Sequence, residues 1–405
     1  MKKGWQKKRL GDVTTKIGSG ATPRGGDESY KAEGISLIRS LNVYDDGFRE
    51  AKLARIDNEQ ADGLSNVVVE PHDVLLNITG ASVARCCRAP ADFLPARLNQ
   101  HVSIIRPVQE KLDSDFLHYL LISKTYKDRL LHTGEEGGST RQAITKAQLQ
   151  EFVVEFPESL AEQQRIVSLL DEAFEGLATA KANAEKNLQN ARALFESHLQ
   201  SVFTQRGPGW VETTLEDICV KITDGEHLRP KVTPSGVPFL SAKDVLAHDV
   251  VFSDHLFVSE ENAAKFRKRC NPEMGDILIV SRGATVGRTC VVKTDRIFCL
   301  LGSVILLKIH ASQSSRFISY ALKSPAIRDQ LMTASEAAAQ QAIYLRDIKP
   351  LEIGCPPVAV QQSIAEKLDA LSAETQRLAR IYERKLAALA ELKKSLLHQA
   401  FTGDL

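Results

Sequence analysis

The sequence predicts an α+β fold in which two similar domains alternate with two long helices. Two long stretches share one helical apolar pattern, and the segments that precede them repeat the same framework pieces along the 405-residue chain. Within those segments the apolar runs are short and rich in β-branched residues, which is typical of strands. We therefore expect the order domain, helix, domain, helix, with the helices packed as an antiparallel coiled coil and related by a pseudo-two-fold axis.

The two helical stretches are the clearest feature of the sequence. Between Leu160 and Thr204 apolar residues recur in alternating steps of three and four, as one buried face of a long helix requires. The same pattern returns after Val360 and ends at Thr402, and Phe401 follows Phe203 at an offset of 198 residues. The two helices therefore align without a gap, which indicates an internal duplication.

The segments between the helices are duplicated as well. Trp5 and Trp210 each open a Trp-x4-Leu-x-Asp pattern, and a strand that follows Asp73 matches one that follows Asp276. Linker residues rich in glycine and proline separate the pieces. We expect two recognition domains at residues 1–157 and 207–356, and two helical segments at residues 158–206 and 357–405.

Each domain is expected to combine strands with short helices. Strands are predicted at 73–76, 102–105, 276–280 and 304–307, because these runs are apolar, short and bounded by turn residues. Helices are predicted at 115–129 and 315–323, where apolar residues recur at helical spacing. This mixture within one domain defines the α+β class.

Composition excludes several classes of protein. The 52 Lys and Arg residues against 51 Asp and Glu residues leave a net charge of +1, so no global excess of positive charge indicates nucleic acid. The N-terminus lacks the apolar core of a secretory leader, and the longest apolar run, 298–307, is too short to cross a bilayer. Seven scattered cysteines without a Cys-x-x-Cys pair favour a reducing compartment. We expect a cytoplasmic protein without a membrane partner.

Motifs for catalysis are not found in the sequence. There is no phosphate-binding G-x-x-x-x-G-K-[ST] loop, no dinucleotide fingerprint and no Asn-Pro-Pro-aromatic tetrapeptide of adenine methyltransferases. A nuclease-like Glu50-Ala51-Lys52 with Asp27 or Asp45 upstream can be found, but such spacing arises by chance in chains of this size. No catalytic or metal-binding residues are therefore predicted.

What both halves do share is a set of loops rich in small polar, glycine and basic residues. Their glycines and prolines favour turns, whereas arginine can pair with guanine or phosphate, and asparagine or glutamine can read adenine. The candidate DNA-binding residues in these loops are Ser19, Thr22, Arg24, Asn77, Thr79, Arg85, Thr140, Arg141, His227, Arg229, Lys231, Ser281, Arg282, Thr285, Arg288 and Gln340.

Taken together, the doubled patterns resemble the specificity (S) subunits of type I restriction-modification systems. They comprise the Trp-x4-Leu-x-Asp opening, the loop with Thr-Pro, the Gly-Asp-hydrophobic strand that leads to a Gly-Ala-Thr turn, and the proline turn into a Gln-Gln-x-Ile helix that ends in Phe-Thr. The first half departs from the second in having His72 for Gly275 and Ala84 for Gly287, which puts its loop shape in question.

This resemblance implies that each domain is a target recognition domain for one half of an asymmetric, bipartite double-stranded DNA sequence. It also implies that the long helices are the spacer and that the subunit itself is not an enzyme. The implied partners are two methyltransferase subunits, which methylate adenine with S-adenosylmethionine, and two restriction subunits, which use ATP and Mg. No cofactor is expected on this chain.

Two other classes of function stay open at the level of sequence. One is a coiled-coil scaffold with two protein-binding domains. The other is a nuclease or methyltransferase that acts alone.

Overall fold

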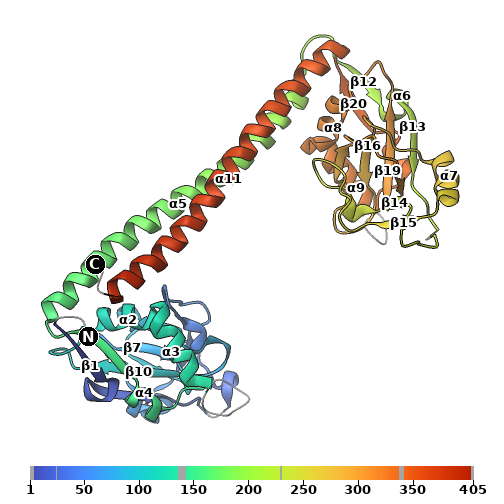
Figure 1. Cartoon of the computed structure of the whole chain (residues 1–405). Coiled ribbons are helices and arrows are strands. Elements are labelled where there is room, and N and C mark those ends of the chain that lie inside the picture. The colour runs from blue at the N-terminus through green and yellow to red at the C-terminus, as the bar shows by residue number, and fades with distance from the viewer. Residues whose placement is uncertain (1–3, 24, 136–142, 229, 337–341, 403–405) are drawn as a thin grey trace. The chain divides into compact units, whose positions relative to one another are not determined.

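The computed structural model describes residues 4–23, 25–135, 143–228, 230–336 and 342–402. Its residues fall into two compact units, the first formed by residues 1–184 and 384–405 and the second by residues 185–383. Each unit thus contains one domain together with one part of each long helix (Figure 1).

The two long helices are α5 (Leu160–Thr204) and α11 (Val358–Thr402), each of 45 residues. They pack antiparallel within each unit. In unit 1, the Lys393 ammonium of α11 lies 4.8 Å from the ring centre of Phe174 on α5. In unit 2, Arg192 of α5 donates a hydrogen bond to the Glu383 carboxylate of α11 at 2.8 Å. The predicted pair of long helices is confirmed, and α11 begins two residues before Val360.

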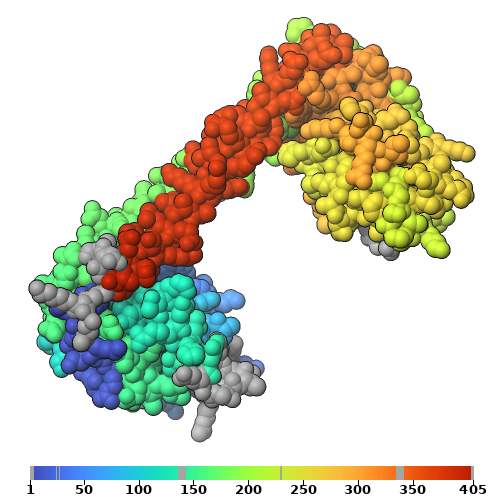
Figure 2. Space-filling model, viewed as in Figure 1, coloured from blue at the N-terminus to red at the C-terminus, as the bar shows by residue number. Residues whose placement is uncertain are grey.

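Each unit is closed by the end of a long helix. In unit 1, Phe116 of α2 (Ser114–Ile122) packs edge-on against Trp5 and Phe401, with ring centres 6.1 and 5.3 Å apart. The equivalent residues in unit 2 are Phe317, Trp210 and Phe203. Figure 2 shows the end of α11, in red, directly against the first domain. The first domain is therefore completed by the second long helix, and the second domain by the first.

The first domain contains eleven strands among its described residues. They are β1 (Trp5–Arg9), β2 (Thr14–Ser19), β3 (Ile35–Ile38), β4 (Val43–Tyr44), β5 (Gly47–Phe48), β6 (Ala54–Ile56), β7 (Val74–Asn77), β8 (Cys86–Arg88), β9 (Ala96–Leu98), β10 (Val102–Pro107) and β11 (Val153–Pro157). Its other helices are α1 (Asn58–Asp62), α3 (Lys124–Glu135) and α4 (Lys146–Glu151). The main sheet has the antiparallel order β2-β10-β7-β8, and a smaller sheet has the order β6-β3-β9.

The second domain repeats this plan. Its strands are β12 (Val211–Thr214), β13 (Cys219–Asp224), β14 (Val237–Leu240), β15 (Leu256–Val258), β16 (Ile277–Val280), β17 (Thr289–Val291), β18 (Cys299–Leu300), β19 (Val304–Ile309) and β20 (Glu352–Cys355). Its helices are α6 (Leu215–Ile218), α7 (Glu260–Arg269), α8 (Ser315–Lys323), α9 (Pro325–Glu336) and α10 (Leu345–Ile348). The sheet orders β13-β19-β16-β17 and β15-β14-β18 match those of the first domain strand for strand.

The inner strands of each main sheet, β7 and β10 in the first domain and β16 and β19 in the second, are buried on both faces. Successive side chains of a strand point to opposite faces. Val74 and Leu76 of β7 therefore pack in the core next to α2 and the long helices, while Leu75 packs in the core of the smaller sheet. Ile277 and Leu278 of β16 divide between two cores in the same way. Full burial explains why these strands read as continuous apolar runs.

One predicted element was wrong. The single helix expected at 115–129 is two helices, α2 and α3, separated at Ser123. Ser123 has an extended backbone, and its buried hydroxyl donates to the Leu120 carbonyl at 2.6 Å. Ser324 divides α8 from α9 in the same manner and is followed by Pro325, which disfavours a helical residue before it. Only the second copy carries this proline signal.

The part of the chain that the structure describes has no helix long and apolar enough to span a membrane.

Candidate nucleic-acid interface

Both domains carry a cavity at the same place in the fold. Three segments that are equivalent in the two domains contribute to its lining. They are the turn after the first strand of the parallel pair, the turn after the third strand of the main sheet in sheet order, and the residues before the second strand in that order. In the first domain these segments follow β3, follow β7 and precede β10. In the second domain they follow β14, follow β16 and precede β19. The repeat thus places a hollow at equivalent positions of the two domains.

The cavity of the first domain measures about 670 Å³. Its lining residues are Ser40, Leu41, Tyr44, Thr79, Gly80, Ala81, Ser82, Arg85, His101 and Ala143. The Thr79 hydroxyl hydrogen-bonds the His101 ring nitrogen Nδ1 at 2.5 Å. The Arg85 guanidinium lies 4.5 Å from the ring centre of Tyr44. Two of the predicted residues, Thr79 and Arg85, therefore face this cavity with hydrogen-bonding and stacking groups.

The cavity of the second domain measures about 380 Å³. Its lining residues are Glu226, His227, Phe239, Ser241, Lys243, Asp244, Leu256, Arg282, Leu301, Gly302 and Ser303. The guanidinium of Arg282 is exposed and lies 5.7 Å from the ring centre of Tyr344. A hydrogen bond to Asp254 raises the pKa of Lys243, so this ammonium stays charged. Arg282 and His227 are the predicted residues that line this cavity.

Two predicted residues do not face the surface. Asn77 is fully buried, and its amide donates to the Ser40 carbonyl at 2.8 Å and to the Ser82 hydroxyl at 3.2 Å. Ser281 is 2% exposed, and its hydroxyl donates to the Gly302 carbonyl. Both side chains hold the cavity walls together, so we leave them out of the interface.

The remaining predicted residues lie around the cavities or outside the described residues. Ser19 and Thr22 are partly exposed near the end of β2, where the Thr22 hydroxyl contacts the Gln100 side chain. Lys231 is exposed, while Thr285 and Arg288 are partly buried in the turn after β16, where Arg288 donates to the Val245 carbonyl. Outside the described residues lie Arg24, Thr140, Arg141, Arg229 and Gln340. Contact of any of these residues with DNA stays a prediction.

A glycine in each domain brings the loop after the first strand of the main sheet against the segment that precedes β10 or β19. Gly20 donates its N–H to the Asn99 carbonyl, and a Cβ there would lie 1.6 Å from the Leu98 carbonyl oxygen. A Cβ at Gly225 would lie 2.2 Å from the Leu300 carbonyl oxygen. No side chain fits at either position, so this close approach requires glycine.

The doubt about the loop shape of the first domain is resolved. His72 and Ala84 have positive φ angles of 69° and 66°, and the equivalent Gly275 and Gly287 have 92° and 79°. The backbone thus turns in the same way in both copies. In the first domain it does so with side chains that disfavour the left-handed region.

Sequence reasoning missed the turn after β3 and β14. The side chain of Asn42 accepts a hydrogen bond from the Arg39 N–H at 3.1 Å, and Asp244 accepts one from the Ser241 N–H at 2.8 Å. These buried caps shape the turns that bring Tyr44 and Lys243 to the cavities. The only sequence signal is an Asn or Asp four residues after the end of the strand, followed by Val, and this pattern is too short to stand out.

Histidine, cysteine and acidic side chains are the groups that metal binding or nucleophilic chemistry would use among the described residues. No group of three or more His, Cys, Asp or Glu side chains there has the arrangement of a metal site. All seven cysteines are buried, and burial raises the pKa of Cys87 to about 12, so it is not a thiolate at neutral pH. The Asp45 carboxylate of the nuclease-like motif is engaged by the Cys86 N–H and the Lys127 ammonium.

Comparisons with known proteins agree with this architecture. The model of the type I restriction modification DNA specificity domain matches residues 2–188 and again residues 208–383. The specificity subunit of the type I restriction enzyme EcoKI from Escherichia coli (strain K12) is 21% identical over 422 residues, which cover 99% of this chain and 89% of the relative. The StySPI specificity subunit from Salmonella potsdam is 20% identical, with coverage of 99% and 89%.

Solved structures share the fold at low sequence identity. One match is a chain from a structure that describes the structural basis underlying complex assembly and conformational transition of the type I R-M system. Its TM-score is 0.77 at 20% identity, with 100% of this chain and 99% of that chain covered. The HsdS subunit from Thermoanaerobacter tengcongensis has a TM-score of 0.64 at 20% identity, with coverage of 100% and 98%. With two copies of the DNA specificity domain over most of its length, the chain belongs to the specificity subunits of type I restriction-modification systems.

Proposed function

We propose that each domain reads one half of a split DNA sequence, and that its cavity is where base edges are recognised. The observation that carries this proposal is the equivalent position of the two cavities, combined with the difference in their side chains. Where the first domain presents Thr79 and His101, the second presents Arg282 and Ser303. Different donors and acceptors select different bases, so the two half-sites are expected to differ.

The chemistry of Arg282 indicates what its domain selects. Its exposed guanidinium carries parallel donors that match the O6 and N7 acceptors of guanine in the major groove. The equivalent Thr79 offers one hydroxyl, which already contacts His101. We therefore propose a guanine in the half-site of the second domain and no equivalent guanine contact by Thr79.

The chain is further proposed to act through other subunits rather than by its own chemistry. Membership of the specificity-subunit family supports partnership with methyltransferase and restriction subunits in addition to DNA. Two copies of each are expected, in the cytoplasm. S-adenosylmethionine, ATP and Mg are proposed to be held by these partners, and no cofactor by this chain.

Paired substitutions test whether each domain reads its own half-site. Arg282→Ala should relax base choice in the half-site of the second domain by about 1–3 kcal/mol of discrimination and leave the other half unchanged. Thr79→Ala should alter only the half-site of the first domain, so each variant is the control for the other. The readout is methylation of a randomised DNA library by the complex with its methyltransferase partner.

An equal loss of methylation on every sequence would show that Arg282 contacts the phosphate backbone and not a base. If neither variant changes methylation or DNA affinity, the cavities are not the reading sites.

A further inference from the structure

A second kind of cavity lies within unit 2, between the second domain and the long helices. It measures about 530 Å³ and is lined by four side chains that can carry positive charge, His248, Lys293, Arg316 and Lys323, together with Tyr320 and Asp369. A neighbouring cavity of about 440 Å³ shares His248, Tyr320 and Lys323 and extends along α5 and α11. These hollows share no lining residue with the base-reading cavity of this domain.

The one carboxylate in the wall of the first hollow is already paired. Asp369 accepts a hydrogen bond from the Arg316 guanidinium at 2.8 Å and another from the Tyr320 hydroxyl at 2.6 Å. Burial and this bond to Asp369 raise the pKa of Tyr320, so its proton stays in place. Arg316 and Asp369 therefore neutralise each other, which leaves three basic groups, Lys323, Lys293 and His248, without a paired carboxylate.

Lys323 is the central group among these three. It ends α8, and its ammonium donates to the Ala247 carbonyl at 3.1 Å and lies 5.8 Å from the ring centre of Tyr320. Among the described residues no carboxylate forms an ion pair with Lys323, Lys293 or His248. A partly buried ammonium with a single neutral acceptor is an unfavourable arrangement unless an anion accompanies it.

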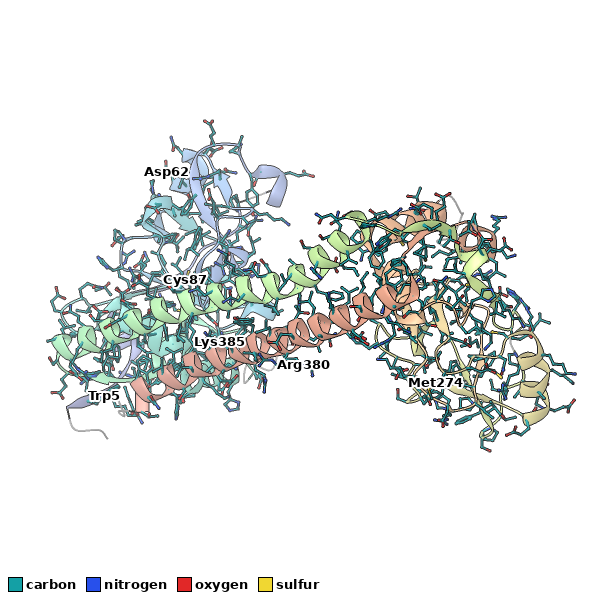
Figure 3. All side chains as sticks on the ribbon, turned by 90° about the horizontal axis from the view of Figure 1, so that it is seen from above. Trp5, Asp62, Cys87, Met274, Arg380 and Lys385 are labelled. Atoms are coloured by element: carbon teal, nitrogen blue, oxygen red, sulfur yellow. The ribbon has the colours of Figure 1, made fainter. Side chains whose placement is uncertain are left out.

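The positive groups also oppose one another. Burial lowers the pKa of Lys323, Lys293 lowers it further, and Cys290 and Asp369 offset part of this shift. The pKa of His248 is lowered by burial and then by Lys323, Lys293 and Arg380, a residue of α11 labelled in Figure 3. An anion placed among them would offset both the desolvation and the mutual repulsion.

The first domain shows that the fold does not need these charges. The position of Lys323 is taken there by Ile122, and that of Lys293 by Pro90. Asp115 stands in place of Arg316 and forms an ion pair with Arg88. The fold therefore tolerates an apolar residue at the end of this helix. The excess of positive charge at this position is found in the second domain and not in the first.

We propose that this cavity of the second domain is a phosphate-binding site. Lys323 and Lys293 supply ammonium donors around one hollow, and phosphate oxygens accept charge-assisted hydrogen bonds from such groups. His248 lines the same hollow and gains a second N–H donor when a bound anion raises its pKa. The Tyr320 ring and the neighbouring hollow leave room for the group that carries the phosphate. The ligand is either a phosphodiester of the DNA backbone or the phosphate of a free nucleotide, because both present the same chemistry.

Thermal unfolding of the full chain with inorganic phosphate tests the site. Phosphate should raise the midpoint by several degrees more than sodium chloride of equal ionic strength, since a ligand of the folded state stabilises it. Lys323→Ile, which copies the first domain, should fold with an unchanged or higher midpoint in chloride and lose the phosphate-specific shift. The control, Lys265→Gln, removes an exposed lysine that pairs with Glu261 on α7 and should respond like the wild type.

The resonances of His248 provide a second readout that does not depend on stability. Phosphate should raise the pKa of His248 in the wild type and not in Lys323→Ile. A phosphate response of Lys323→Ile equal to that of the wild type, or a wild type that responds no more to phosphate than to chloride, would overturn the proposal.

Two further measurements assign the source of the phosphate. If the site holds the DNA backbone, Lys323→Ile should make the plot of log binding constant against log salt concentration less steep for non-specific duplex DNA. The slope should change by about 0.9, the value expected for the loss of one phosphate contact. If it holds a nucleotide, ATP should shift the midpoint at lower concentration than inorganic phosphate, with the slope unchanged. Either result supports a phosphate site and identifies its ligand.

Discussion

At the scale of single residues, His118 shows how the first domain depends on pH. Its ring nitrogen Nε2 is inaccessible to solvent and has no hydrogen-bond partner among the residues that the structure describes. Burial is the main cause that lowers the pKa of His118 from its ordinary 6.5 to about 4. The folded protein therefore keeps this imidazole neutral at pH values where an unfolded chain binds a proton.

This difference predicts a loss of stability in mild acid. Because the unfolded state binds more protons, the free energy of unfolding should fall as the pH decreases from 6.5 towards 4, by at most about 1.4 kcal/mol per pH unit. Above pH 6.5 the contribution is fully present. Urea unfolding at several pH values measures the slope, and His118→Gln, which cannot titrate, should show a shallower one. Equal slopes in both proteins would show that His118 does not cause the dependence.

At the scale of elements, a buried glutamine fastens each long helix to a domain. The Gln163 side chain accepts a hydrogen bond from the Asp113 N–H at 2.8 Å. It donates to the carbonyls of Lys111 and Pro157 at 3.0 and 2.8 Å. Gln361 repeats the arrangement at the start of α11, with Ser314 and Pro356. One amide thus joins the helix start, the strand before it and the start of a domain helix.

The anchor predicts a clear effect of substitution. Gln163→Leu keeps the volume but leaves a backbone N–H and two carbonyls without their partner, which should cost about 2–3 kcal/mol of stability. The neighbouring Gln164 is exposed, so Gln164→Leu should change stability by less than about 0.5 kcal/mol. Chemical denaturation compares the two variants. Similar effects at both positions would show that the buried amide does not act as an anchor.

At the scale of the whole molecule, the chain order and the packing order differ. The last turns of α11 belong to the core of the first domain, where Leu397 and Ala400 are 8% and 1% exposed. The last turns of α5 belong to the core of the second domain in the same way, through Leu199 and Phe203. Neither domain is therefore complete without the end of a helix.

A charge placed in the last turn of α11 should consequently weaken the first domain and spare the second. Ala400→Glu buries a carboxylate beside α2, so amide hydrogen exchange should become faster in Ser114–Ile122 and stay unchanged in Ser315–Lys323. Ala388→Glu, at an exposed position of the same helix, is the control. Faster exchange in both domain helices would contradict this assignment of the cores.

Much of this architecture follows from the sequence because it depends on local periodicity. The three-four spacing after Leu160 is sufficient for a helix whatever it packs against, and the apolar run before Asn77 is sufficient for a buried strand. Because the sequence repeats internally, each element predicted in one half could also be predicted in the other half. Where the local signal was weak, as at Ser123, the prediction joined two helices into one.

The sites were decided by tertiary structure. Sequence alone determined that polar loops follow the central strands, but not that Thr79 faces a cavity while Asn77 turns inward to Ser40, 37 positions away. Nor did it separate Lys323 from any other lysine on a helix. The direction of a side chain and the pairing of a charge depend on groups far apart in sequence, and only the folded chain brings them together.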